Sequence, residues 1–192
     1  MEIKDIMLTS PKAVKAGSYI TNEVSEEMIG NSIREAQEIH LQSIIGSNLL
    51  LRLKTLVYNE MQGYADSINE AENADYKTLL DEYVEPYLIA KTQAGICIPI
   101  TFKVRNMGVV YNSDTNVNNG GLDTAYAAQR RFNVLADQRA TLLSMFLCTN
   151  RKDYPELDEG GCGCGAYVRP LIGRKFVSVP LSLGNKHGDC CC

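Results

Sequence analysis

The sequence predicts a mainly α-helical protein with a short β-hairpin or loop insertion and an extended C-terminal arm. Apolar residues recur at helical spacing through the first hundred residues and again after residue 122. Between them, residues 101–121 change to β-branched residues and then to a run rich in Asn and Gly. The last segment is rich in Gly and Cys and is interrupted by prolines. We therefore expect a helical domain over residues 1–157, and a hinge and arm over 158–192.

The first long helix has a clear start. Ser25 can cap it, and Glu26 and Glu27 favour its first turn because acidic side chains complement the positive end of the helix dipole. Helical spacing places five residues on one inward stripe: Ile29, Ile33, Ala36, His40 and Ile44.

Gly46 ends the first helix, and Ser47 can cap a second one that runs from Asn48 to about Met61. We expect the two helices to form a helical hairpin. The inward residues of the second are Leu49, Leu50, Leu53, Leu56 and Val57.

The third helical region contains a proline. Residues 64–75 are acidic and read as a surface loop, and helix resumes around Tyr76. Pro86 removes a backbone donor, so we expect the helix to end near Val84 and to kink or restart with Pro86 in its first turn. Residues 87–98 are apolar nearly all round, which predicts burial in the core or against another subunit.

The pattern then changes to that of a strand or hairpin over Thr101 to Tyr111, followed by a polar loop from Asn112 to Gly121. Asp123 or Thr124 can cap a long helix that ends near Cys148. Its predicted inward stripe is Ala128, Phe132, Leu135, Leu142 and Phe146.

Charge is unevenly distributed along the chain. Residues 1–100 carry 8 Lys/Arg and 15 Asp/Glu, whereas residues 101–192 carry 11 and 8. This asymmetry suits two surfaces that meet different partners, or copies of the chain that meet head to tail, although uneven solvated faces would give it too. A pI of 5.3 disfavours a basic nucleic-acid-binding protein. No apolar run is long enough for a membrane span, so we expect a protein that stays in the cytosol where it is made.

No motif indicates catalysis. His40 lies on an apolar stripe, where a packed core or interface histidine is the simpler interpretation. Cys97 and Cys148 lie in apolar contexts and are expected to pack as small reduced hydrophobes. Soft metal ligands gather in the tail, but the Cys-x-Cys spacing is tighter than a zinc knuckle and no predicted helix or hairpin frames them. We therefore predict no enzymatic activity, cofactor or metal site, and keep a metal- or redox-responsive binding module as the alternative, with Cys162, Cys164, His187 and Cys190 as its candidate ligands.

The segment from Tyr167 to Leu183 is predicted to dock on a partner as an extended arm. Gly160 to Gly165 would supply the flexible hinge that lets it reach. Basic side chains can meet acidic groups at the rim of an interface, while apolar ones supply buried area. The candidate binding residues are Arg169, Arg174, Lys175, Phe176, Val177, Val179, Leu181 and Leu183.

The order of these elements resembles a known family. The residues that carry the resemblance are Ser25-Glu26-Glu27, Ile33 to Gln37, Ile44-Ile45-Gly46, Pro86, the strand Val104 to Tyr111 with Gly108, and Tyr154-Pro155-Glu156. Over residues 1 to about 157 the chain resembles head-tail connector (adaptor or ring) proteins of tailed bacteriophages, especially those of crAss-like Bacteroides phages. The Cys-rich tail is not part of this pattern.

The resemblance implies a structural virion protein, made in the host cytoplasm and located at the head-tail junction. Its copies would form a ring, by resemblance a dodecamer, that joins the portal protein to neighbouring tail or ring proteins. Genomic DNA would pass through the channel without sequence-specific binding, and no membrane would be involved. The polar loop is then the candidate to reach the channel or an adjoining ring, through Asn112, Asn116, Asn118, Asn119 and Gly120.

Overall fold

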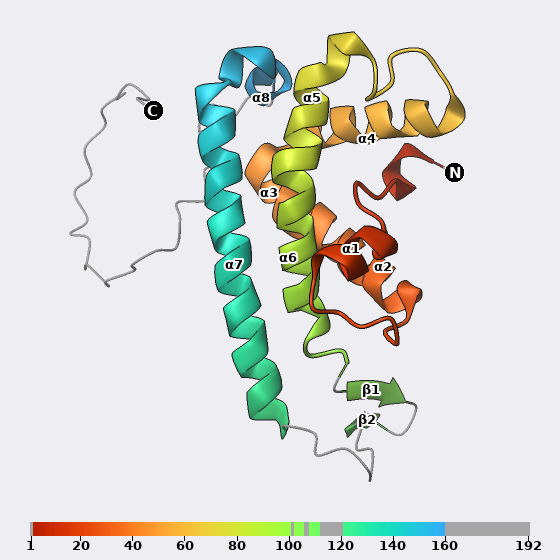
Figure 1. Ribbon diagram of the computed structural model, residues 1–192, viewed down its shortest axis with the longest axis vertical. Helices are drawn as coiled ribbons and strands as arrows, with labels where there is room; N and C mark the ends of the chain where they lie inside the picture. The colour runs from red at the N-terminus through yellow and green to blue at the C-terminus, as the bar shows by residue number, and fades with distance from the viewer. Residues whose placement is uncertain (1, 101, 106–107, 112–120, 160–192) are drawn as a thin grey trace, which may run out of the picture.

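The computed structural model describes residues 2–100, 102–105, 108–111 and 121–159, and these form a mainly α-helical fold (Figure 1). The principal helices are α1 (Pro11–Gly17), α2 (Glu26–Glu35), α3 (Gln42–Ile45), α4 (Ser47–Gln62), α5 (Ala74–Thr78), α6 (Glu85–Ile96), α7 (Gly121–Thr149) and α8 (Glu156–Glu159). Two π-helical turns (Ala36–Leu41 and Leu79–Val84) and three 3-10 turns (Ile3–Asp5, Ala71–Asn73 and Arg151–Asp153) connect them. In the described part, no helix is long and apolar enough to cross a membrane.

Helix α6 lies at the centre of the body. It packs against α7 on one side and against α1 and α2 on another, and with α5 it forms one helical column beside α7 (Figure 1). Its buried residues occupy all sides of the helix: Tyr87, Leu88, Ala90, Thr92, Gln93, Ala94 and Ile96. The predicted burial of this helix is confirmed, and helices of the same chain bury it. The apolar character of α6 therefore does not require contact with a second subunit.

The apolar stripe of the first helix changes register at the π-helical turn Ala36–Leu41. Ile29, Ile33 and Ala36 are buried as expected. The wider turn holds one extra residue, so Leu41 and Ile45 then face the core, whereas His40 and Ile44 are only half-buried. The predicted stripe was wrong beyond Ala36 because it assumed an uninterrupted α-helical period.

A second π-helical turn (Leu79–Val84) leads into Pro86. The amide of Glu85 donates to the carbonyl of Leu80, five residues back, and Pro86 then occupies the first turn of α6. Pro86 stands at the predicted position in a first turn. The chain stays helical through Pro86 because the wider π-helical turn before it accommodates the proline ring and the missing backbone donor.

Gly46 turns the chain between α3 and α4. Its φ of +81° is favourable only for glycine, and Gly46 itself is the N-cap of α4, so Ser47 is the first helical residue and not the predicted cap. Helix α4 packs against α8 and the N-terminal 3-10 turn (Ile3–Asp5), and it crosses the upper part of the body in Figure 1. The predicted helical hairpin is therefore an angular corner.

Strands β1 (Phe102–Arg105) and β2 (Gly108–Tyr111) form an antiparallel pair in which Phe102 is opposite Tyr111 and Arg105 is opposite Gly108. This agrees with the hairpin expected between the central helix and the long helix. The pair lies at the end of the body where α6 ends and α7 begins (Figure 1).

Helix α7 begins at Gly121, two residues before the first predicted cap, and ends at Thr149. Ala125, Ala136, Leu143 and Leu147 form its buried face. Leu135 and Leu142 were expected inward, but they are 38% and 49% exposed. This part of the predicted stripe was wrong because the helix is apolar on two sides, and only packing decides which side faces the core.

Candidate interaction surfaces

The predicted site residues fall outside the described part of the chain. This holds for the arm residues, for the loop candidates Asn112, Asn116, Asn118, Asn119 and Gly120, and for the tail candidates Cys162, Cys164, His187 and Cys190. The described body, residues 2–159 with its gaps, has four features that can be evaluated: a polar pocket, a groove, a polar cluster and an apolar helix face.

The polar pocket lies where the first π-helical turn, α6 and α7 meet. Glu35 and His40 line it from one side, Lys91 from α6, and Gln129 and Asn133 from α7, around about 180 Å³. Lys91 Nζ donates to Asn133 Oδ1 at 2.9 Å. Burial lowers the pKa of His40, and the positive charge of Lys91 lowers it further. The imidazole is therefore biased toward its neutral form.

The arrangement around His40 differs from that of a nucleophilic site. Burial raises the pKa of Cys97, whose Sγ donates to the carbonyl of Gln93 at 3.3 Å, so this thiol is a poor nucleophile. Within the described residues, no group of three His, Cys, Asp or Glu side chains could hold a metal ion.

The groove lies between α2 and the C-terminal end of α6, and we call it the α2–α6 groove. Apolar and acidic side chains share its lining, which includes Glu27, Met28, Glu35, Ile96 and Pro99 around about 370 Å³. It adjoins the polar pocket, since Ser32, Glu35 and Gly95 border both. A concave, partly apolar strip with acidic walls suits a segment that brings apolar and basic side chains.

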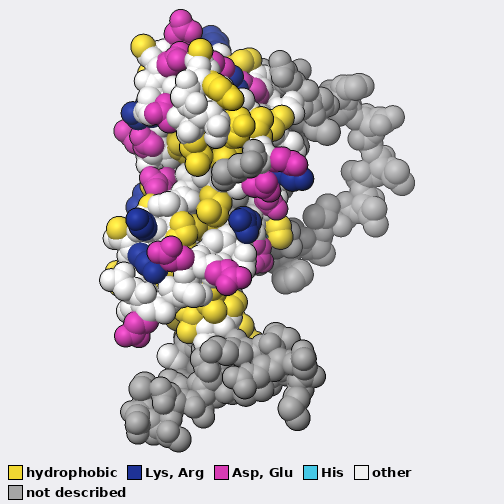
Figure 2. Space-filling view, turned by 90° about the vertical axis from the view of Figure 1, so that its right-hand side faces the viewer, with side chains coloured by type: hydrophobic (Ala, Val, Ile, Leu, Met, Phe, Trp, Pro, Cys, Tyr) yellow, Lys and Arg dark blue, Asp and Glu magenta, His cyan; other side chains and the backbone are white. Residues whose placement is uncertain are grey.

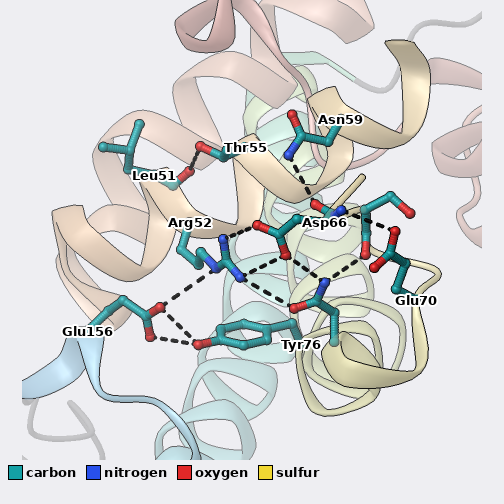
Figure 3. Close-up of polar contacts among 10 residues, drawn as sticks. Leu51, Arg52, Thr55, Asn59, Asp66, Glu70, Tyr76 and Glu156 are labelled. Carbon is teal, nitrogen blue, oxygen red and sulfur yellow. Dashed lines mark hydrogen bonds and ion pairs between the residues drawn. The ribbon is translucent and has the colours of Figure 1, made fainter. Parts of the chain in front are cut away.

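The polar cluster joins α4, the 64–73 loop, α5 and α8, and we call it the Arg52 clamp (Figure 3). Arg52 donates to both carboxylate oxygens of Asp66, at 2.7 and 3.1 Å, and to Asn73 Oδ1 at 3.4 Å. Its Nε lies 3.9 Å from a carboxylate oxygen of Glu156, and its guanidinium lies 5.5 Å from the centroid of the Tyr76 ring. One cation thus holds together segments that are up to about a hundred residues apart.

Tyr76 completes the clamp. Its hydroxyl hydrogen-bonds the Glu156 carboxylate, with distances of 2.8 and 2.9 Å to the two oxygens. Burial, together with this carboxylate, raises the pKa of Tyr76 to about 12, so the hydroxyl stays a donor at neutral pH. The neighbouring Tyr154 packs edge-on against Tyr76 and donates to the carbonyl of Asp75 at 3.0 Å. Residues 154–157, which precede the predicted hinge, are therefore firmly attached to the body.

The 64–73 loop is more ordered than its acidic composition suggests. Asp66 adopts a left-handed conformation with φ of +60°, and Ile68 and Asn73 are buried. No spacing pattern in the sequence relates the members of the clamp, because they come from four separate segments. The only hint was an unpaired Arg on a Leu-rich helix before an acidic loop.

The side of α7 that points away from the core carries four exposed apolar residues, which we call the outer face of α7. Val134, Leu135, Leu142 and Met145 are 58%, 38%, 49% and 61% exposed. They lie within about a third of the helix circumference over three turns, on an arc that they share with the exposed Arg131 and Gln138.

Other exposed apolar side chains are more dispersed. Leu51, Met61 and Tyr64 belong to α4 and the residue pair that follows it, and Tyr64 packs near Tyr58. Figure 2 shows one face of the body, where hydrophobic side chains occur in small groups between acidic and basic ones. Such mixed surface is ordinary for a folded domain.

A family model described as a family of unknown function, DUF6712, matches residues 41–166. The match spans α3 to α8, including the Arg52 clamp and the outer face of α7, and leaves out residues 1–40 and 167–192. No curated protein matches the chain, and no solved structure does either.

Proposed function

We propose a structural role for this chain, which belongs to the DUF6712 family of proteins of unknown function. In this proposal it is a virion subunit whose copies form a ring at the head-tail junction of a tailed phage, joining the portal protein to tail or ring proteins around the DNA channel. The resemblance to head-tail connector proteins supports the phage context, and the surface of the body supports association.

The outer face of α7 is the observation that carries the proposal. Val134, Leu142 and Met145 are each about half exposed or more, although the opposite side of the same helix is buried in the core. Exposing these apolar side chains to water is unfavourable, at roughly 25 cal/mol per Å² of apolar surface, and contact with another molecule removes that cost. We therefore place a subunit contact here.

The uneven charge supports head-to-tail contacts. Residues 1–100 carry a net charge of −7 and residues 101–192 one of +3, counted from Lys, Arg, Asp and Glu. A closed ring needs two different surfaces per copy that complement each other, and opposite charge is one way to provide them. The described side chains in turn include no constellation of nucleophile, base and orienting group, so catalysis has less support than assembly.

The polar loop and the arm have separate roles in this proposal. The hairpin β1–β2 lies at one end of the body and precedes the loop in the sequence, and in this proposal the loop reaches the channel or an adjoining ring. The Arg52 clamp fixes α8, from which the hinge and arm continue. A rigid starting point makes a flexible arm more effective, because it limits the volume that the arm explores.

The test is the assembly state of the full-length protein, measured by native mass spectrometry and electron microscopy, alone and with the portal protein. We expect a closed ring. Leu142→Asp should prevent ring formation without changing the circular dichroism spectrum, because the side chain lies on the outer face of α7. Leu51→Asp is the matched control, since Leu51 is similarly exposed, at 57%, on α4.

A protein that stays monomeric with and without the portal protein would overturn the proposal, as would equal loss of the ring in both variants. Measuring the zinc and copper content of the same purified protein tests the alternative, a metal-responsive binding function. One bound metal ion per chain that is lost on Cys162→Ser would favour the alternative.

A further inference from the structure

The α2–α6 groove has a fixed shape because the two helices touch at its floor. Ser32 Oγ donates to the carbonyl of Thr92 at 3.3 Å, and a Cβ added at Gly95 would lie 2.6 Å from Ser32 Oγ. The absence of a side chain at Gly95 thus permits the close approach. Above this contact, Met28 and Pro99 provide apolar surface that is open to solvent on one side, while Ile96 lies buried beneath them.

The size of the groove fits an extended peptide segment. Its α2 wall runs from Ser25 to Glu35, which at 1.5 Å per residue is about 15 Å. Four or five extended residues at about 3.3 Å each span that length. In the arm sequence, Val177, Val179 and Leu181 alternate with other residues, a spacing that puts apolar side chains on one side of an extended strand.

Charge is also complementary between groove and arm. Glu27 and Glu35 line the groove, and its lining among the described residues includes no Lys or Arg. Residues 160–192 contain four Lys or Arg and one Asp, and Arg174-Lys175 directly precede Phe176. An arm seated by its apolar residues would therefore bring its basic pair to acidic walls.

We propose that the α2–α6 groove is the receptor for residues 177–181 of the arm from a neighbouring copy, with Arg174 and Lys175 at its rim, an inference that rests on the proposed ring. The arm and the groove then form the two unlike surfaces that a heterologous contact requires. Residues 159–177 can span up to about 60 Å when extended, which exceeds the length of about 35 Å of the helical column α5–α6 that separates α8 from the groove within one copy (Figure 1).

A photo-cross-linking experiment on the full-length chain tests this exchange. Phe176 is replaced by p-benzoylphenylalanine, and equal amounts of unlabelled and ¹⁵N-labelled protein are mixed under unfolding conditions and assembled together. We expect cross-linked peptides that join residue 176 to segments 25–35 or 95–99, about half of them pairing a labelled with an unlabelled peptide. Tyr64 replaced by the same photoreactive residue is the control, because Tyr64 is exposed away from the groove.

Charge variants sharpen the test. Glu27→Lys and Arg174→Glu should each lower the yield of groove cross-links about tenfold, and the two together should restore most of it. Glu72→Lys, exposed in the 3-10 turn before α5, should leave the yield unchanged. Cross-links confined to peptides of one label would show that the arm binds its own groove, and cross-links elsewhere would show another receptor. Either result overturns the inference.

Electron microscopy of the same samples separates this inference from the proposed function. An intact ring without groove cross-links overturns only the arm exchange. A monomer without a ring overturns both.

Discussion

Replacing Arg52 by Met should loosen the attachment of α8 to the body. Arg52 is the one side chain that contacts all the other members of the clamp, through Asp66, Asn73, Tyr76 and Glu156. Methionine preserves most of the apolar stem that packs beside Tyr76, so the variant isolates the loss of the guanidinium.

The expected loss of stability is about 1–3 kcal/mol. A hydrogen bond to a charged group contributes about 1.5–3 kcal/mol when buried, and Arg52 makes two to Asp66. This must be discounted for solvent, because the side chains of Arg52 and Asp66 are 30% and 51% exposed. A second contribution increases the expected loss, because the Glu156 side chain is only 16% exposed and would lose its nearest cation.

Urea unfolding followed by circular dichroism measures this effect. At an m-value of about 2 kcal/mol/M, a loss of about 1–3 kcal/mol lowers the midpoint by roughly 0.5–1.5 M. Arg34→Met is the control, because Arg34 is exposed on α2 and should change stability by less than about 0.5 kcal/mol. Hydrogen exchange should also become faster in residues 154–159. If Arg52→Met changes the midpoint no more than Arg34→Met, and exchange in α8 is unaltered, the clamp does not hold α8.

Three further predictions follow from the described contacts. Hydrogen bonding by Arg52 lowers the pKa of Asp66 in the folded protein. The ionised Asp66 therefore stabilises the fold above its unfolded pKa of about 3.9, and this stabilisation is lost as the pH falls through the lower folded pKa. The stability gap between wild type and Asp66→Asn, measured by urea unfolding from pH 7 to pH 3, should therefore shrink below about pH 4; a constant gap would contradict this. Gly46→Ala should lower the free energy of unfolding by about 1–3 kcal/mol, because Gly46 has φ of +81° and ψ of 166°, and Gly63→Ala should lower it by about 1 kcal/mol, because Gly63 is in the left-handed helical region. Thermal unfolding measures both, and variants as stable as wild type would refute the backbone argument. Leu143→Ala should lower the free energy of unfolding by about 2–5 kcal/mol because Leu143 is fully buried, and Leu142→Ala should lower it by less than about 0.5 kcal/mol because Leu142 is 49% exposed. A comparable loss at both positions would show that the outer face of α7 is not free in the monomer.

The helices themselves could be derived from sequence because their signals are local. Ser25 accepts a hydrogen bond from the amide of Met28, as a capping serine should, and Pro86 occupies a first helical turn. Leu49, Leu53 and Leu56 are fully buried at the positions that helical spacing predicts. Each of these depends on residues within about one or two turns, so a single sequence contains the required information.

The site was much less predictable. The Arg52 clamp joins residues 14 to 104 positions apart, and no local pattern relates Arg52 to Glu156. The residues expected to bind partners, such as Phe176 in the arm and Asn116 in the loop, remain predictions, because they lie outside the described residues. The body contributes instead the groove and the outer face of α7.

By itself, the sequence determined the fold class, the approximate positions of the longer helices α2, α4, α6 and α7, and the hairpin between α6 and α7, because capping, periodicity and proline chemistry act over a few residues. Only the tertiary structure decided which apolar residues face inward. A π-helical turn moved the buried position from His40 to Leu41, and packing of α7 on α6 buried Leu143 while leaving Leu142 in solvent. The physical reason is the same in both cases. A helix with apolar residues on more than one side has several possible buried faces, and the choice belongs to the elements that pack against it.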